Sequence, residues 1–309
     1  MPDQRILVIK LGAFGNVVLS LAAFGAIRAH HPGAEISVLT TAPYAGWLGE
    51  SPWFDKVLID QRPNWWDLAG VLRLRRQLIA GRFGRVYDLQ TSGRSSRYFR
   101  LFWPGPKPEW SGIADGCSHP DRDPRRDHIH DMDRQHGQLR QAGIETIPPV
   151  NLDWCQSDIG RFNLPRDFAL LIPGSSPHRP AKRWPATAYR ELARALAADG
   201  ITPVVLGAAS ERPLAEAIGA PFDLTGQTGF NDLVCLARAA RFAVGNDTGP
   251  MHLAAAAGCR SVVLFSSESD PALCAPRGAD VTVLSRARLA DLQVDDVLAA
   301  TRSHNLKAT

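Results

Sequence analysis

The chain has 309 residues, of which 45% are hydrophobic and 21% are charged. This composition is normal for a soluble globular protein, and the length exceeds what one hydrophobic core usually holds, so we expect two domains. The formal net charge of +4 suits an anionic ligand or a membrane surface, but it is too small to indicate nucleic-acid binding.

The cysteines and the apolar N-terminal region bear on the compartment. The five cysteines are odd in number, scattered, and form no C-x-x-C pair, so neither a zinc site nor a disulfide framework is indicated. Residues 11–27 are largely apolar and loosely resemble a signal peptide, but Gly12, Gly15, Asn16 and Ser20 interrupt the run. The segment is also too short to span a bilayer. We therefore expect a protein of the reducing cytoplasm without a transmembrane segment.

Strands and helices alternate through the first half of the chain. Apolar β-branched runs predict strands, and apolar residues at helical spacing predict helices. We expect strands at residues 5–9, 35–40, 56–59 and 85–89, and helices at 16–30, 42–49, 66–80 and 132–142. This order predicts a parallel sheet with helices on both faces. Residues 104–134, rich in Pro, Gly, Asp, Arg and His, are predicted to form a long loop or lid.

The same alternation restarts after a proline-containing linker at residues 145–165. We expect strands at residues 168–172, 202–206, 222–224, 242–245, 261–265 and 281–284, and helices at 185–198, 211–218, 231–240, 250–257 and 289–301. The prediction is an α/β protein of two doubly wound domains, residues 1–150 and 151–309, that face a cleft. In such sheets ligands bind at the carboxyl ends of the strands.

The stretch VGNDTGPMH, residues 244–252, is the strongest indication of a ligand site. It reads as the end of a strand, a polar turn and a buried helix, whose first backbone N–H groups and positive dipole end suit a diphosphate. Gly249 permits close approach of a ligand, and Pro250 suits a first helical turn. The alternative is an ordinary helix capped by Asp247 or Thr248.

A second segment, residues 173–185, runs from a strand to a helix and is basic. Ser175 and Ser176 offer hydroxyl groups, Lys182 offers a point charge, and Arg183 could chelate two phosphate oxygens. The alternative is a solvated basic loop, but the prolines and serines crowded into this segment favour ligand binding.

Weaker signals lie in other turns and in one helix. Glu211 follows a predicted strand and could accept both hydroxyls of a ribose, or only complement a helix dipole. The turn that contains Thr228 could line an adenine pocket or be an ordinary turn. His252 is either structural or a neutral donor to a phosphate oxygen. Gly12 and Gly15 permit a tight turn and close substrate approach, without the spacing of a dinucleotide fingerprint.

Two arginine clusters and four tryptophans complete the features of interest. We interpret the clusters as solvated faces, with contact to an anionic lipid acceptor as the minority interpretation. The tryptophans could stack on sugar, but core packing is favoured. The clusters are Arg73, Arg75, Arg76 and Arg94, Arg97, Arg100, and the tryptophans are Trp65, Trp66, Trp103 and Trp110.

The motifs IKLGAFGN, PGSSPHRPAKRWP, LGAASE, LTGQT and VGNDTGPMHLAAAAG together resemble those of the ADP-heptose:lipopolysaccharide heptosyltransferases, glycosyltransferase family 9. Their order and spacing agree over most of the chain, least between residues 104 and 165. The resemblance implies a GT-B fold of two Rossmann-like domains, with the acceptor side in residues 1–150 and the nucleotide-sugar site in residues 151–309. It also implies that the final helix packs back on the N-terminal domain.

The activity implied is inverting, metal-independent transfer of heptose from ADP-heptose to the inner core of a lipopolysaccharide, without a cofactor. The implied partners are the nucleotide sugar and the anionic lipopolysaccharide core, with peripheral contact at the cytoplasmic face of the inner membrane and no nucleic acid. In this resemblance Lys182 is catalytic and binds donor phosphate, Glu211 holds the ribose and Thr228 lies by the adenine. The other donor-binding residues implied are Gly12, Gly15, Ser175, Ser176, Arg183, Asp247, Thr248, Gly249, Pro250 and His252.

One departure from the family concerns the base. Members usually carry Gly-Asp where this chain has Gly15-Asn16, and that aspartate is held to deprotonate the acceptor. An amide cannot take up the proton, and loss of a positioned base typically costs about 10²–10⁴ in rate. Three accounts compete: an engineered residue, a slow or differently based transferase, and a catalytically silent nucleotide-sugar binder. A GT-B sugar epimerase is a further rival.

Overall fold

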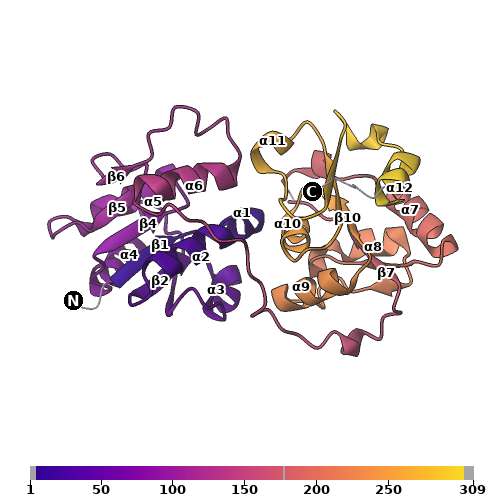
Figure 1. The fold of residues 1–309 in the computed structure, drawn as a ribbon, viewed down its shortest axis with the longest axis horizontal. Helices are drawn as coiled ribbons and strands as arrows, with labels where there is room; N and C mark the ends of the chain where they lie inside the picture. The colour runs from indigo at the N-terminus through magenta and orange to yellow at the C-terminus, as the bar shows by residue number, and fades with distance from the viewer. Residues whose placement is uncertain (1–4, 177, 303–309) are drawn as a thin grey trace. The chain divides into compact units, whose positions relative to one another are not determined.

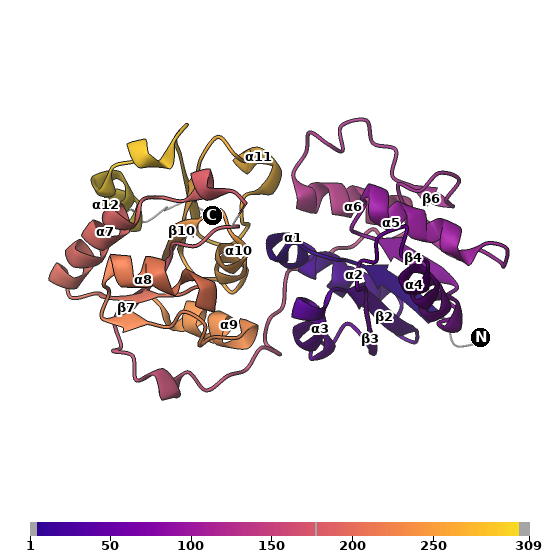
Figure 2. The ribbon, with the colours of Figure 1, turned by 180° about the vertical axis from the view of Figure 1, so that it is seen from behind.

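The computed structural model describes residues 5–176 and 178–302. The chain divides into two compact units, residues 1–154 and 155–309. Each unit contains one six-stranded parallel sheet with helices packed on both faces (Figure 1, Figure 2).

The first unit has the strand order β3-β2-β1-β4-β5-β6. Strand β1 lies at its centre, and its residues 6–9 are completely buried because helices cover both faces. Leu7 and Ile9 pack with Leu74 and Leu78, which places α4 over that face. The elements are β1 Arg5–Ile9, α1 Phe14–Val18, α2 Leu21–His30, β2 Glu35–Thr40, α3 Ala42–Gly49, β3 Lys56–Ile59, α4 Leu68–Ala80, β4 Arg85–Asp88, α5 Gly93–Tyr98, η1 Phe99–Phe102, β5 Glu109–Gly112, β6 His119–Pro120 and α6 Asp131–Gln141.

The second unit has the order β12-β11-β10-β7-β8-β9, and its last helix packs on α7 and β11. Numbered within each unit, both sheets therefore follow the order 3-2-1-4-5-6, which reverses direction between the first and fourth strands. The elements are η2 Gly160–Phe162, β7 Phe168–Ile172, η3 Pro180–Lys182, α7 Ala186–Ala198, β8 Thr202–Val205, η4 Ala209–Glu211, α8 Arg212–Ile218, β9 Phe222–Asp223, α9 Phe230–Ala239, β10 Ala243–Asn246, α10 Gly249–Ala256, β11 Ser261–Phe265, α11 Pro271–Cys274, β12 Val281–Ser285, η5 Leu289–Asp291 and α12 Val294–Arg302.

Three sequence predictions need correction. The helix expected at residues 16–30 is two helices, α1 and α2, and Ser20 between them donates from Oγ to the Asn16 carbonyl. The loop expected at residues 104–134 contains β5 and β6, which extend the sheet but are too short to show a period. The last helix begins at Val294, after the separate turn η5.

The tryptophans divide into buried and exposed residues. Trp110 is fully buried and packs against Phe99 and Phe102, as expected of a core residue. Trp66 and Trp103 are 81% and 71% exposed, so the expectation of core packing is wrong for both. In the described part of the chain, no helix combines the length and the apolar character needed to cross a bilayer.

Candidate functional site

In the second unit, the sheet reverses its strand order between β7 and β10, and the segments that follow these strands are tied together by Asn246. This residue is fully buried at the end of β10. Its Nδ2 donates to the carbonyls of Pro173 (2.6 Å) and Gly174 (3.1 Å), and its Oδ1 accepts from the Trp184 backbone N–H at 3.0 Å. One amide thus fixes both ends of the basic loop against the turn that precedes α10.

The same two segments meet through their charged side chains. Lys182 Nζ lies 2.5 Å from Asp247 Oδ2, and Ser269 Oγ donates to that oxygen at 2.8 Å. His252 Nε2 lies 3.5 Å from the other carboxylate oxygen. The side chains of Lys182 and Asp247 are 12% and 8% exposed, so the pair is shielded from water. The two segments thus converge at this ion pair. Ser269 was not found from the sequence, because it lies beyond the next strand.

Asp247 is held in its ionised form. Its burial would raise the pKa, but hydrogen bonds from His252, Lys182 and Ser269 outweigh this effect and lower the pKa to about 2. The carboxylate therefore neutralises Lys182 across the pH range in which most proteins are stable.

The lowered pKa predicts an acid-dependent loss of stability. The ionised Asp247 stabilises the fold above the unfolded value of 3.8, and this stabilisation disappears as the pH falls through about 2. Between about pH 6 and about pH 3, the free energy of unfolding should fall by about 1 kcal/mol more in the wild type than in Asp247→Asn. Urea titrations at several pH values measure the difference, and parallel pH profiles would contradict it.

The N-terminus of α10 follows directly. Thr248 is the N-cap residue, yet its side chain makes no capping hydrogen bond, so the predicted alternative of a side-chain cap from Thr248 is not observed. Thr248 Oγ1 and His252 Nδ1 are buried and have no hydrogen-bond partner among the described residues. Gly249 and Pro250 begin the first turn, in which the N–H groups of Gly249 and Met251 have no carbonyl acceptor within the helix and Pro250 has no N–H. The turn thus presents the positive end of α10 beside Lys182.

The basic loop is braced from within. Arg183 donates from Nε to Ser175 Oγ (3.0 Å) and from Nη2 to the Ser175 carbonyl (3.2 Å). Two of the N–H groups of Arg183, which were expected to bind phosphate oxygens, therefore donate to Ser175. Ser175 is buried, whereas Ser176 is exposed.

Glu211 lies against glycines of two neighbouring turns. A Cβ on Gly174 or Gly207 would collide with its carboxylate, so both positions need glycine for this packing. Glu211 Oε2 accepts from the Ala208 N–H at 2.8 Å. The next turn along the edge, which contains the half-buried Thr228, is joined to this one by a hydrogen bond from Gly226 N to the Gly207 carbonyl.

In the first unit, the corresponding reversal of strand order lies between β1 and β4. The buried side chain of Lys10 directly follows β1 there. Lys10 Nζ donates to the Leu89 carbonyl at 3.0 Å and lies 4.0 Å from Asp131 Oδ2. Burial lowers the pKa of Lys10, and Asp131 opposes this shift. Asp131, in the first turn of α6, also pairs with Arg134. No sequence pattern pointed to Asp131, because it lies more than a hundred residues from Lys10.

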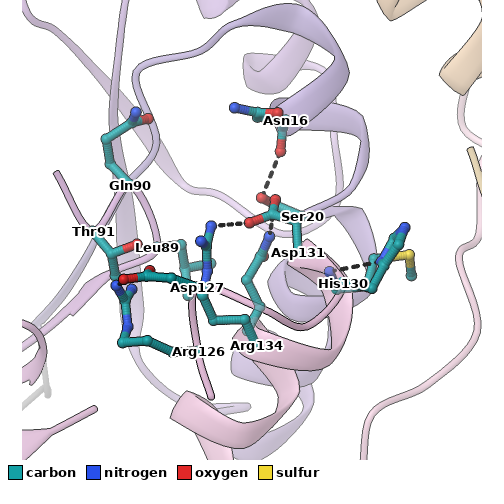
Figure 3. Close-up of polar contacts among 12 residues, drawn as sticks. Asn16, Ser20, Leu89, Gln90, Thr91, Arg126, Asp127, His130, Asp131 and Arg134 are labelled. Carbon is teal, nitrogen blue, oxygen red and sulfur yellow. Dashed lines mark hydrogen bonds and ion pairs between the residues drawn. The ribbon is translucent and has the colours of Figure 1, made fainter. Parts of the chain in front are cut away.

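Asn16 stands on α1 above this cluster. Its side chain is exposed and points away from Asp131 and Ser20 (Figure 3). Gly12, in the loop before α1, has a φ of +117°, and a Cβ there would lie 2.9 Å from the Tyr44 ring. Gly12 and Gly15 belong to the first unit, whereas the other donor-binding residues expected from the sequence belong to the second.

No group of three or more His, Cys, Asp or Glu residues that could hold a metal ion occurs in the described part of the chain. Both candidate clusters instead combine one lysine with one carboxylate, Lys182 with Asp247 and Lys10 with Asp131.

The family model "Glycosyltransferase family 9 (heptosyltransferase)" matches residues 131–298, more than half of the chain. The chain belongs to glycosyltransferase family 9. It is 25% identical over 285 residues to the lipopolysaccharide core heptosyltransferase OpsX of Haemophilus influenzae, covering 85% of this chain and 79% of that protein. It is 26% identical over 297 residues to lipopolysaccharide heptosyltransferase 2 of Salmonella typhimurium, covering 86% and 84%. The prediction of a glycosyltransferase is thus confirmed.

Solved structures agree on the fold. The Escherichia coli ADP-heptose lps heptosyltransferase II superposes with a TM-score of 0.77 at 22% identity, covering 96% of this chain and 97% of that one. The E. coli heptosyltransferase WaaC with ADP gives 0.76 at 21% identity, covering 96% and 98%. The predicted α/β fold of GT-B type, with two doubly wound sheets, is confirmed.

Proposed function

We propose that this glycosyltransferase moves heptose from ADP-heptose to a lipopolysaccharide inner-core acceptor, with the donor bound by the second unit and the acceptor by the first. The observation that carries the proposal is the meeting of Lys182 with the turn before α10, because a cation beside a helix N-terminus suits a diphosphate. The family supports the sugar, and the relatives described above, which are named lipopolysaccharide heptosyltransferases, support the acceptor. The E. coli WaaC structures with ADP and with a fluorinated ADP-heptose support the donor.

The proposed donor site follows the carboxyl edge of the second sheet. The diphosphate lies at the turn Thr248–Gly249–Pro250, with Lys182 and the Ser176 hydroxyl beside it. Glu211 accepts the ribose hydroxyls, and the turn around Thr228 faces the adenine. Ser175, buried and bonded to Arg183, holds the loop in shape instead of facing the ligand.

Asp247 has a positioning role in this proposal. A carboxylate near a diphosphate is repulsive unless it is neutralised, and here Lys182, Ser269 and His252 surround it. We expect Asp247 to fix the Lys182 ammonium at the place where phosphate charge develops. When the donor binds, Lys182 keeps two further N–H donors for phosphate oxygens.

The proposed reaction is one in-line displacement with inversion at the anomeric carbon. The acceptor oxygen forms the new bond to that carbon, its proton passes to a base or to solvent, and the bond to the diphosphate breaks with its electron pair leaving on ADP. Lys182 and the N-terminus of α10 stabilise the negative charge of the departing diphosphate. Because these fixed positive groups supply the stabilisation, we propose that no metal ion or other cofactor is needed.

The acceptor core is anionic and lipid-linked, so we propose that the protein works in the cytoplasm, peripherally at the inner face of the inner membrane. The net charge of +4 favours such a surface.

Calorimetric titration with ADP, UDP and GDP tests the donor assignment. We expect ADP to bind at least about tenfold more tightly than the other two, because the turns at Glu211 and Thr228 are proposed to fit its nucleoside. Equal weak binding of all three would reject the assignment. A transfer assay on a heptose-deficient core should release ADP only when the acceptor is present, whereas donor turnover without an acceptor would favour a sugar epimerase.

A further inference from the structure

The outer side of α4 carries large apolar side chains that face solvent. Trp66 and Trp103 are 81% and 71% exposed, and Leu68 and Leu72 are 71% and 47% exposed. Of the large apolar side chains exposed in the described part of the chain, all except Val283 lie in the first unit. We call Trp66, Leu68, Leu72 and Trp103 the α4 face.

These four residues form one surface. Leu68 and Leu72 are four residues apart on α4 and therefore lie on one side of the helix. Trp66 precedes the helix by one turn residue, Asp67, which caps it. Trp103, although distant in sequence, is tied to α4 because Arg75 Nη2 donates to its carbonyl at 3.0 Å. The turn η1, which ends just before Trp103, also packs against α4. Helix α4 lies at the near side of the first unit in Figure 2.

Burial in the protein does not account for this face. The opposite side of α4 already supplies Leu74 and Leu78 to the core, so the helix is apolar on two sides. A surface helix of a globular protein normally places polar residues outward, and a grouped apolar patch marks a surface that contacts a partner.

Positive charges outnumber negative ones around the face, where Asp67, the capping residue between Trp66 and Leu68, is an exposed carboxylate. Helix α4, with the sequence LAGVLRLRRQLIA, contains three arginines and no acidic residue. Arg73 and Arg76 are exposed, and Arg100 and Lys107 are exposed on either side of Trp103. Indole rings and leucines bordered by arginines are the combination that sits at the boundary between the headgroups and acyl chains of an anionic bilayer.

We propose that the α4 face docks on a membrane of anionic phospholipid, with Trp66, Trp103, Leu68 and Leu72 entering the headgroup layer and Arg73 and Arg76 meeting lipid phosphates. The inference rests on the proposed function only in that a lipid-linked acceptor lies at such a surface. The docking itself needs neither donor nor acceptor.

Vesicle flotation without nucleotide tests the proposal. The full chain should float with vesicles of phosphatidylcholine containing about 30% phosphatidylglycerol, and much less with phosphatidylcholine alone. The double variant Trp66→Ala/Trp103→Ala should bind the anionic vesicles at least about tenfold more weakly, because the apolar area that enters the membrane is lost. The variant Arg73→Gln/Arg76→Gln should lose most of the preference for anionic lipid.

Matched controls lie in the second unit. Val283→Ala removes an exposed apolar side chain from β12, and Arg194→Gln removes an exposed arginine from α7, and neither should change flotation. Thermal melting curves and ADP titration of each variant should match those of the wild type, which shows that the fold and the donor site are intact.

Three results would overturn the proposal. Two of them are equal flotation of the wild type and the tryptophan double variant, and no flotation of either. The other is a concentration-dependent dimer that the double variant loses, which would assign the α4 face to a second copy of the chain. If the wild type floats but fails to bind ADP, the proposed function fails while the membrane docking stands.

Discussion

Lys182→Met is expected to lower heptose transfer by about 10²–10³, because one preorganised positive group is removed from the departing diphosphate. The variant also leaves Asp247 buried without its cation, and this carboxylate then repels the donor phosphates. We therefore expect the affinity for ADP to fall together with kcat. Steady-state kinetics and calorimetric titration of ADP measure the two effects separately.

A double variant distinguishes the lost attraction between Lys182 and the diphosphate from the new repulsion between Asp247 and the donor phosphates. In Lys182→Met/Asp247→Asn the uncompensated charge is gone, so ADP affinity should recover in part while kcat stays low. Lys56→Met is the matched control, because Lys56 is an exposed lysine that also pairs with a carboxylate, that of Glu35. It should leave both quantities unchanged. If Lys182→Met keeps transfer within about threefold of the wild type, the proposed electrostatic role is wrong.

The fold of the second unit follows closely from local sequence signals. The strands predicted at residues 168–172 and 261–265 begin and end where β7 and β11 do, because a run of buried apolar residues is bounded by turn residues on each side. The prediction of a loop at residues 104–134 was wrong for the opposite reason. Strands of four and two residues carry no period, and the pairing of β5 with β4 is a long-range contact that no local pattern reports.

The candidate site was also predicted only in part. Lys182 and the turn at Asp247 were predicted together, because each follows a parallel strand and such strands end at one edge. The sequence did not reveal that Arg183 donates hydrogen bonds to Ser175, nor that Ser269 donates one to Asp247. Those contacts depend on how the loops fold back, which composition does not specify. Trp66 and Trp103 were misassigned because tryptophan is buried in most contexts, and only the structure shows which are exposed.

The replacement Asn16→Asp is expected to raise kcat by about 10²–10⁴, because it supplies a carboxylate that can take the acceptor proton. The side chain of Asn16 is exposed, so a new charge there carries little desolvation cost. The affinity for ADP should not change, since the donor is proposed to bind in the second unit. The pH profile of kcat in the variant should gain an acidic limb, below which the new carboxyl group is protonated and cannot act as a base. Asn64→Asp, at an exposed position of the same unit, is the matched control and should leave kcat unchanged.

The structure makes the contrary outcome equally informative. If Asn16→Asp leaves kcat unchanged and Asp131→Asn abolishes transfer with ADP binding intact, the base is the α6 carboxylate that lies 4.0 Å from Lys10. If Asn16→Asp binds ADP and still transfers to no core acceptor, the chain is a nucleotide-sugar binder that has kept the Lys182 site without the chemistry. The three accounts of Asn16 therefore predict three different patterns of kcat in these two variants, each with ADP binding intact, and measuring kcat and ADP affinity in both variants distinguishes them.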